Sequence, residues 1–138
     1  MAESIAPKYR AVTKSIEVTV APRFIAERSS PDNGYYFWAY TINIINRSEE
    51  TVQLKTRHWR ITDATGKQQE VDGPGVVGEQ PVLKAGESFE YTSGVPLPTP
   101  SGFMRGTYGM VRTENGAPFE IEIPAFSLDF SDAQRTIN

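Results

Sequence analysis

The chain of 138 residues contains no cysteine and a single histidine, His58. The lack of cysteine excludes disulfides, thiolate nucleophiles and cysteine-ligated metal sites. One histidine is a poor basis for a cobalt site, because cobalt favours imidazole ligands. The composition therefore excludes cysteine-dependent sites and disfavours a transition-metal site built from histidines.

Long apolar runs are also missing from the sequence. No stretch approaches the ~20 apolar residues that span a bilayer. The first ten residues, MAESIAPKYR, lack the apolar segment of a secretory signal. We therefore expect a cytoplasmic protein that does not insert into membranes.

Positive charge is sparse. The net charge is −3, from 17 acidic and 14 basic residues. A duplex-binding protein needs a concentrated basic surface that releases counterions. The densest basic group here, Lys55, Arg57, His58 and Arg60, is short and is interrupted by Trp59. No nucleic acid duplex is expected as a partner.

What the chain does contain is a strand pattern punctuated by eleven glycines and ten prolines. Ile16, Val18 and Val20 alternate with polar residues, which predicts one half-buried strand over residues 12–20. Residues 35–46, YYFWAYTINIIN, are apolar on both faces for much of their length and predict a central strand. The PDNG segment between these strands predicts a turn.

Two later segments change the face on which their apolar residues lie. Over residues 51–62 the apolar positions pass from even to odd numbers, which predicts a β-bulge near residues 55–57. Residues 119–130 show the same break at Pro124, where proline cannot donate to a strand ladder. Either a bulge or a switch between sheets would explain this second break.

No segment has a sustained 3.6-residue apolar period, so the chain is expected to be all-β. An immunoglobulin-like or fibronectin type III-like β-sandwich of seven to eight antiparallel strands fits the spacing of strands and turns best. We expect one domain over residues 10–130, between a flexible N-terminal tail (residues 1–9) and a C-terminal tail (residues 131–138).

The motifs between residues 59 and 110 carry a family resemblance. After Trp59 they read ITDATGK, EVDGPGVVGEQPVL, AGESFEYTSG and GFMRGTYGM, in this order. The chain resembles the ApaG family over about residues 10–130, and the resemblance implies a fibronectin type III-like ApaG domain. It also implies a link, by name, to cobalt and magnesium efflux, and no agreed enzymatic activity. Related domains are appended to eukaryotic F-box proteins and to a polymerase-δ-interacting protein.

Within these motifs Gly73, Gly75 and Gly78 match the G-x-G-x-x-G pattern of dinucleotide-binding loops. In those enzymes the loop opens a helix whose N-terminus meets the pyrophosphate, whereas Pro81 here disfavours helix at Gln80. A nest of backbone N–H groups could still hold an anion. The two interpretations are a site for a pyrophosphate-containing nucleotide and a rigid structural loop.

Catalysis and metal binding lack an organised set of residues. No serine lies in a G-x-S-x-G elbow, and His58 is the only imidazole available as a base. Asp63, Glu70 and Asp72 could converge near one loop, but no metal-ligand spacing organises them. We therefore expect no catalytic residues, no metal site, no cofactor and no enzymatic activity.

A binding module remains as the main hypothesis. Residues 95–103, VPLPTPSGF, are expected to form a stiff apolar loop in which Pro96, Pro98 and Phe103 contact a protein partner. An exposed sheet edge could add a partner's strand or join two copies as a homodimer. The sequence thus favours a non-enzymatic interaction domain. Its resemblance connects that domain with cobalt and magnesium homeostasis, through a protein partner or a regulatory ligand.

Overall fold

The computed structural model describes residues 9–130. The strands are β1 (Tyr9–Thr13), β2 (Ile16–Phe24), β3 (Tyr36–Asn46), β4 (Val52–Asp63), β5 (Gln68–Pro74), β6 (Val82–Leu83), β7 (Ser88–Leu97), β8 (Ser101–Arg112) and β9 (Pro118–Asp129). Two single-turn 3-10 helices, η1 (Ala26–Arg28) and η2 (Pro31–Asn33), join β2 to β3. Within residues 9–130 no helix has the length and apolar character that crossing a bilayer requires.

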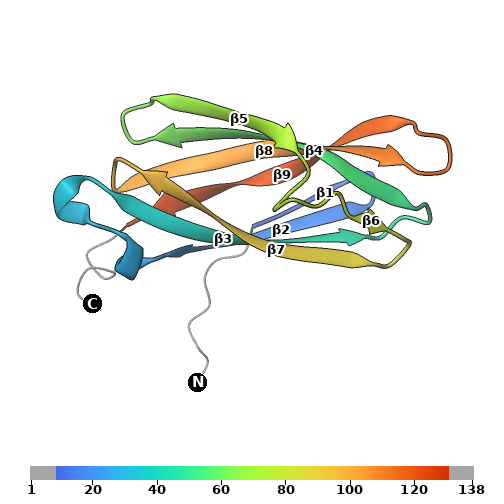
Figure 1. Ribbon diagram of the computed structural model, residues 1–138, viewed down its shortest axis with the longest axis horizontal. Helices are drawn as coiled ribbons and strands as arrows, with labels where there is room; N and C mark the ends of the chain where they lie inside the picture. The colour runs from blue at the N-terminus through green and yellow to red at the C-terminus, as the bar shows by residue number, and fades with distance from the viewer. Residues whose placement is uncertain (1–8, 131–138) are drawn as a thin grey trace, which may run out of the picture.

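The strands form two antiparallel sheets that pack face to face (Figure 1). One sheet has the order β1-β2-β3-β7, and the other has the order β5-β4-β8-β9, with β6 also paired to β4. The predicted all-β antiparallel sandwich is confirmed. The strand number exceeds the predicted seven to eight, because the chain adds the short β1 and the two-residue β6.

The core lies between the sheets and takes alternate side chains of the longer strands, as the pleat requires, whereas β1 and β5 contribute no buried residue. The predicted central strand is β3, which lies between β2 and β7, and its side chains Trp38, Tyr40 and Ile42 are buried. Trp59 of β4 packs edge-on against Tyr40, with ring centroids 5.4 Å apart. Aromatic contacts of this kind connect the two sheets at the centre of the domain.

The sequence predicted one strand over residues 12–20, where the structure has parts of two strands, β1 and β2. Residues 12–20 do not form one strand, because the chain turns at Lys14 and Ser15, whose φ angles are 49° and 65°. Two adjacent residues with positive φ make the tight turn that suits a two-residue β-hairpin. Tyr9, assigned to the flexible tail, instead begins β1 and pairs with Val20. The other predicted tail residues, 1–8 and 131–138, lie outside the described residues.

Both predicted breaks in strand parity correspond to bulges. The register of β4 against β8 shifts between Leu54 and Thr56, so Lys55 is the extra residue. In β9 the register shifts where Met104 pairs with Phe126 and Gly106 pairs with Ile123. β9 remains in one sheet throughout, so the break at Pro124 is a bulge and not a switch between sheets.

The segment 95–103, predicted to be a stiff loop, is mostly strand. Val95 and Leu97 are buried at alternate positions of β7, and β8 begins at Ser101. Proline is tolerated at Pro96 because β7 is an edge strand, where a missing N–H need not break a ladder. Only residues 98–100 lie between the two strands.

The two lateral sides of the sandwich differ. On one side β1 and β2 pack against β9, and the Glu122 N–H donates to the Thr13 hydroxyl at 3.1 Å. On the other side the outer edges of β5 and β7 pair with no strand among residues 9–130. One side is therefore closed, and the other leaves two free strand edges.

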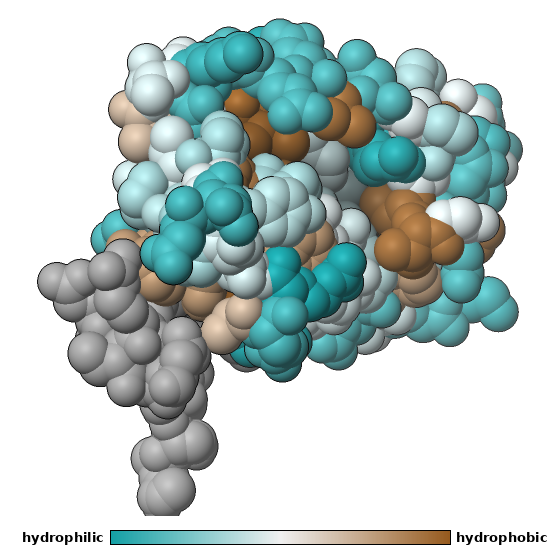
Figure 2. All heavy atoms as spheres, turned by 60° about the vertical axis from the view of Figure 1, so that its left-hand side comes forward, coloured by the Kyte–Doolittle hydropathy of each residue, from teal (hydrophilic) through white to brown (hydrophobic). Residues whose placement is uncertain are grey.

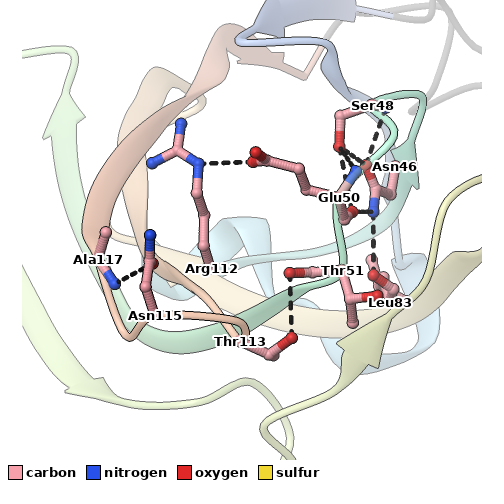
Figure 3. A network of polar contacts seen from close by, with 9 residues as sticks. All are labelled: Asn46, Ser48, Glu50, Thr51, Leu83, Arg112, Thr113, Asn115 and Ala117. Carbon is pink, nitrogen blue, oxygen red and sulfur yellow. Dashed lines mark hydrogen bonds and ion pairs between the residues drawn. The ribbon is translucent and has the colours of Figure 1, made fainter.

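The end of the sandwich near the β3–β4 turn is held by Asn46, which is fully buried (Figure 3). Its side-chain nitrogen donates to the carbonyls of Glu50 and Leu83, at 2.7 and 2.9 Å. Its side-chain oxygen accepts from the N–H and the hydroxyl of Ser48. Nearby, Arg112 pairs with the Glu50 carboxylate at 2.6 Å. This network fixes the ends of β3, β4 and β6 to one another.

Replacing Asn46 by aspartate should destabilise the domain, because a carboxylate oxygen would then face the carbonyls of Glu50 and Leu83. We expect the free energy of unfolding to fall by about 2–4 kcal/mol, measured by denaturant titration. Asn115→Asp is the matched control, since the exposed Asn115 only accepts one hydrogen bond, from the Ala117 N–H. Equal losses in both variants would contradict the role given to Asn46.

Candidate ligand groove at the open side of the sandwich

The open side of the sandwich contains an elongated hollow, which we call the side groove. It consists of two adjoining cavities of about 410 and 320 Å³ that share Ile61, Gln69 and Pro96. The larger cavity has the size of many small-ligand sites. Besides the shared residues it is lined by Tyr40, Arg57, Trp59, Val71, Val76, Val77, Gly78, Tyr91, Ser93, Gly94, Val95 and Met104. The smaller cavity adds Asp63, Lys67, Gln68, Leu97 and Pro98.

One end of the side groove is formed by the glycine-rich loop, and the bulge in β4 anchors this loop. The carbonyl of Lys55, the extra residue of the bulge, accepts hydrogen bonds from the Gly75 N–H at 2.8 Å and the Gln80 side chain at 2.9 Å. Arg57 donates from Nη1 to the carbonyls of Pro74 and Gly75, at 2.9 and 2.8 Å. The bulge that changes the parity of β4 therefore also positions the loop.

The tip of the loop is a tight turn over residues 76–79. Val76 and Glu79 exchange two backbone hydrogen bonds of 2.8 Å, and the φ angles of Val77 and Gly78 are 43° and 81°. Positive φ at both central residues is the geometry of a type I′ turn. Val76 is only 1% exposed and belongs to the core, so the turn is fixed to the sandwich from inside.

The three glycines proposed as a pyrophosphate site have different places in this loop. Gly75 has a φ of 61°, and a Cβ there would lie 2.3 Å from the Glu79 carbonyl oxygen. Gly78 supplies positive φ in open space, and Gly73 pairs with Arg57 in the β4–β5 ladder. The N–H groups of Gly75, Val76 and Glu79 already donate within the protein. Pyrophosphate binding at these glycines stays a prediction, with fewer free N–H donors than the pattern implies.

Val77 is unusual in both backbone and exposure. A β-branched residue rarely adopts positive φ, because its Cβ branches crowd the backbone. Val77 nevertheless has a φ of 43°, and 54% of its surface is exposed at the rim of the side groove. Asparagine or glycine would suit this turn position better. Strain of this kind is most often found at binding sites, and here it sets an apolar side chain beside the groove.

Arg57 is the cation that lines the larger cavity of the side groove. It is half-buried, and among residues 9–130 it forms no ion pair with a carboxylate. Both of its hydrogen bonds to the loop leave from Nη1, although a guanidinium has five N–H donors. A Cβ added at Gly73 would lie 2.8 Å from Arg57 Nη2. The missing side chain at Gly73 thus leaves room for the guanidinium beside the edge of β5.

The floor of the groove carries buried phenols. The hydroxyls of Tyr91 and Tyr108 are hydrogen-bonded to each other. Burial raises the pKa of Tyr91, Tyr108 and Tyr40, because the charged phenolate is poorly solvated there. For Tyr40, a hydrogen bond with Ser93 and the positive charge of Arg57 oppose this rise in pKa. These tyrosines are therefore neutral hydrogen-bonding groups at physiological pH.

The residues considered for metal binding lie elsewhere, on the outer face of the five-stranded sheet. His58 and Asp72 are hydrogen-bonded through Nδ1, and His58 Nε2 lies 3.9 Å from Glu70. Arg60 also approaches Glu70, at 3.5 Å. Asp63 does not join this group, since its carboxylate accepts from Thr65 and Lys67 in its own turn. Hydrogen bonding from Thr65 leads the contributions that lower the pKa of Asp63.

The three residues predicted to contact a partner are not brought together. Pro96 and Pro98 line the side groove on the β7 side. Phe103 is 43% exposed on the outer face of the other sheet, where it pairs with Thr62 and Ser127. On the face shown in Figure 2, hydrophobic residues reach the surface as separate small clusters among hydrophilic ones. Partner contact by these residues stays a prediction.

Sequence reasoning missed Arg57 as a site residue and treated it only as part of a short basic group. The predicted bulge near residues 55–57 could have revealed this role. Once Lys55 is the extra residue, Arg57 takes the same parity as the buried Trp59 and Ile61 and must point between the sheets. An arginine at an inward position of a strand is rare unless it has a partner.

The fold and the groove define a single β-sandwich domain with a ligand-sized hollow between two free strand edges. The family model of the ApaG domain matches residues 26–112. The chain is 67% identical over 130 residues to protein ApaG of Bradyrhizobium diazoefficiens, covering 94% of this chain and 99% of that protein. Protein ApaG of Rhodopseudomonas palustris is 65% identical with the same coverage. The chain belongs to the ApaG family.

A solved structure supports the assignment. The crystal structure of a Bordetella pertussis protein described as ApaA superposes with a TM-score of 0.81 and is 48% identical. The match covers 92% of this chain and 98% of that one. The family resemblance and the sandwich fold expected from the sequence are therefore both confirmed.

Gly75→Ala should destabilise the domain, because it combines positive φ with a clash against the Glu79 carbonyl. We expect the free energy of unfolding to fall by about 2–4 kcal/mol. Gly78→Ala is the control: its φ is also positive, but a Cβ there meets no atom within 4 Å, so the loss should be about 1–2 kcal/mol. A stable Gly75→Ala variant would show that the loop has no structural need for this glycine.

The tyrosines under the groove should make the domain sensitive to alkali. Each of these tyrosines has a higher pKa in the folded state than its unfolded value of about 10. Its contribution to the free energy of unfolding is therefore complete below pH ~10 and is lost as the pH rises further, because the unfolded chain ionises first. Above that pH, each such tyrosine lowers the free energy of unfolding by about 1.4 kcal/mol per pH unit. Tyr108→Phe should flatten the fall in unfolding free energy between about pH 10 and 12, whereas the exposed Tyr35→Phe should not. Identical slopes would contradict this assignment.

Proposed function

We propose that this ApaG-family chain is a non-enzymatic, cytoplasmic binding domain that acts through its side groove. In this proposal it influences cobalt and magnesium homeostasis by binding a protein partner or a regulatory ligand, and it does not handle the metal itself. The connection with cobalt and magnesium comes from the family resemblance, and the site comes from the groove.

The observation that carries the proposal is the placement of Arg57. The half-buried Arg57 guanidinium donates to the carbonyls of Pro74 and Gly75 but has no carboxylate partner among residues 9–130, so its positive charge is not neutralised there. Arg57 lines the larger cavity of the groove with aromatic and aliphatic residues and with the polar Gln69 and Ser93, next to two unpaired strand edges. A bound group of opposite charge would complete the missing pair.

The arrangement around His58 supports a role without catalysis. Both ring nitrogens of His58 face carboxylates, Asp72 at Nδ1 and Glu70 at Nε2. A general base for nucleophilic chemistry would instead face a hydroxyl or thiol. His58 also lies on the outer face of the sheet, away from the side groove, whose lining does not include it.

A pyrophosphate-containing nucleotide is the competing candidate. Its support is that the glycine loop lies directly beside Arg57, which could pair with a phosphate. The same ligand would have to do without the N–H groups of Gly75, Val76 and Glu79. Amide NMR titration with ATP distinguishes the nucleotide candidate from the proposed function, since nucleotide binding should shift the amide resonances of Gly73, Gly75 and Gly78 together.

The test of the proposal is a groove-filling substitution. Gln69 is exposed on β5 and lines both cavities, so Gln69→Trp should block the groove while leaving the strand intact. In cells that lack the chain and carry each variant, we expect Gln69→Trp to fail to restore growth in excess Co²⁺. Thr107→Trp, on the outer face of the same sheet opposite His58, is the control and should restore growth.

Both variants must first show thermal unfolding close to that of the parent protein. Full restoration of Co²⁺ tolerance by Gln69→Trp would contradict a function through the groove. If cells that lack the chain tolerate Co²⁺ normally, the link with metal homeostasis is wrong.

A further inference from the structure

We infer that the side groove takes an extended peptide segment of a partner protein, which pairs with the outer edge of β5 and places an acidic side chain against Arg57. This inference rests on the proposed function and names the chemistry of its ligand. In this mode of binding, main-chain hydrogen bonds to β5 supply affinity, as in other cases of strand addition. The contact between the acidic side chain and Arg57 supplies specificity.

The shape of the groove favours an extended chain. The two cavities share Ile61, Gln69 and Pro96 and so run along the strands rather than forming one compact pocket. β5 covers seven residues, Gln68–Pro74, which corresponds to about 20 Å of strand. A peptide of similar length beside β5 would direct every second side chain into the groove.

β5 is a better pairing edge than β7. The part of β7 that lines the groove includes Pro96, which has no N–H to offer. Proline on an edge strand is a common defence against pairing. β5 has no proline before its last residue, Pro74. Its outer edge is therefore the one that can accept a full strand.

The charge contact follows from the register of β5 on β4. Arg57 pairs with Gly73, and its Nη2 occupies the space that a side chain at Gly73 would fill. The guanidinium thus lies directly under the edge at which a new strand would pair. An inward side chain of that strand, next to Gly73, would meet Arg57 first, and a carboxylate is its matching group.

The remaining walls select apolar neighbours for this acid. Val71 of β5 and Val77 at the rim lie along the groove, above a floor that contains Trp59 and Tyr91. Val77 keeps its apolar side chain exposed despite a φ of 43°. The ligand expected is therefore a strand with one acidic residue whose inward neighbours, two positions away, are aliphatic or aromatic.

The experiment selects random nonapeptides displayed on phage against the immobilised full-length chain. We expect enriched peptides to contain an acidic residue with apolar residues two positions away. Synthetic versions are then tested for binding by fluorescence polarisation, with the acid replaced by its amide as the first comparison. Replacing the acid should weaken binding by at least about tenfold, as expected when one partner of a sheltered ion pair is removed.

Two substitutions at Val77 provide a matched pair that preserves the fold. Aspartate and asparagine both tolerate left-handed backbone, so neither should strain the turn. Val77→Asp places a negative charge at the rim of the cavity that contains Arg57 and should weaken the acidic peptide by about tenfold relative to Val77→Asn. Arg57→Gln is informative only if its amide spectrum shows that the loop has kept its structure, because Arg57 also holds the Pro74 and Gly75 carbonyls.

Hydrogen exchange locates the bound strand. Slower amide exchange within residues 69–73 on peptide binding is expected, whereas protection along β7 would contradict pairing at β5. A library that yields no enriched peptide, or peptides that bind Val77→Asp and Val77→Asn equally, would overturn the inference. If the library fails while Gln69→Trp still loses Co²⁺ tolerance, the groove functions with a ligand that is not a peptide. A concentration-dependent dimer with the same β5 protection would identify a second copy as the occupant and would equally overturn it.

Discussion

The hydrogen bonds that hold the glycine-rich loop to β4 are the constraint on which the site depends. The bulge at Lys55 frees a carbonyl for Gly75 and Gln80, and it turns Arg57 inward so that its Nη1 reaches the carbonyls of Pro74 and Gly75. The loop therefore closes one end of the groove and fixes the guanidinium at the same time. A continuous β4 without the extra residue would direct Arg57 to the outer face.

The second requirement is the asymmetry of the sandwich. On the closed side, β1 covers the edge of β9 through the contact between Thr13 and Glu122. On the open side, β5 and β7 end their sheets without a further strand among residues 9–130. Free edges are usually protected because they invite association. Here β7 carries Pro96 and β5 borders the Arg57 guanidinium, which is the asymmetry that the proposed strand pairing at β5 relies on.

The sequence predicted what local pattern controls and missed what depends on distant segments. The apolar run over residues 35–46 predicted β3, and the change of parity predicted the bulge near Lys55 and a bulge or a switch between sheets at Pro124, where the structure has a bulge. The turn at Lys14 and Ser15 was missed because neither residue is the glycine or asparagine that usually marks positive φ. The groove was missed because β5 and β7 lie in different sheets, and no local pattern reports that their free edges share one side.

Anomalous diffraction from bromide-soaked crystals tests the central claim most directly. Bromide is a small anion that binds where a cation lacks a partner, and its position is measured without assuming a ligand. The account predicts a bromide peak at the Arg57 guanidinium, inside the side groove and beside Gly73. Peaks confined to other basic side chains, with none at Arg57, would contradict an available charge in the groove.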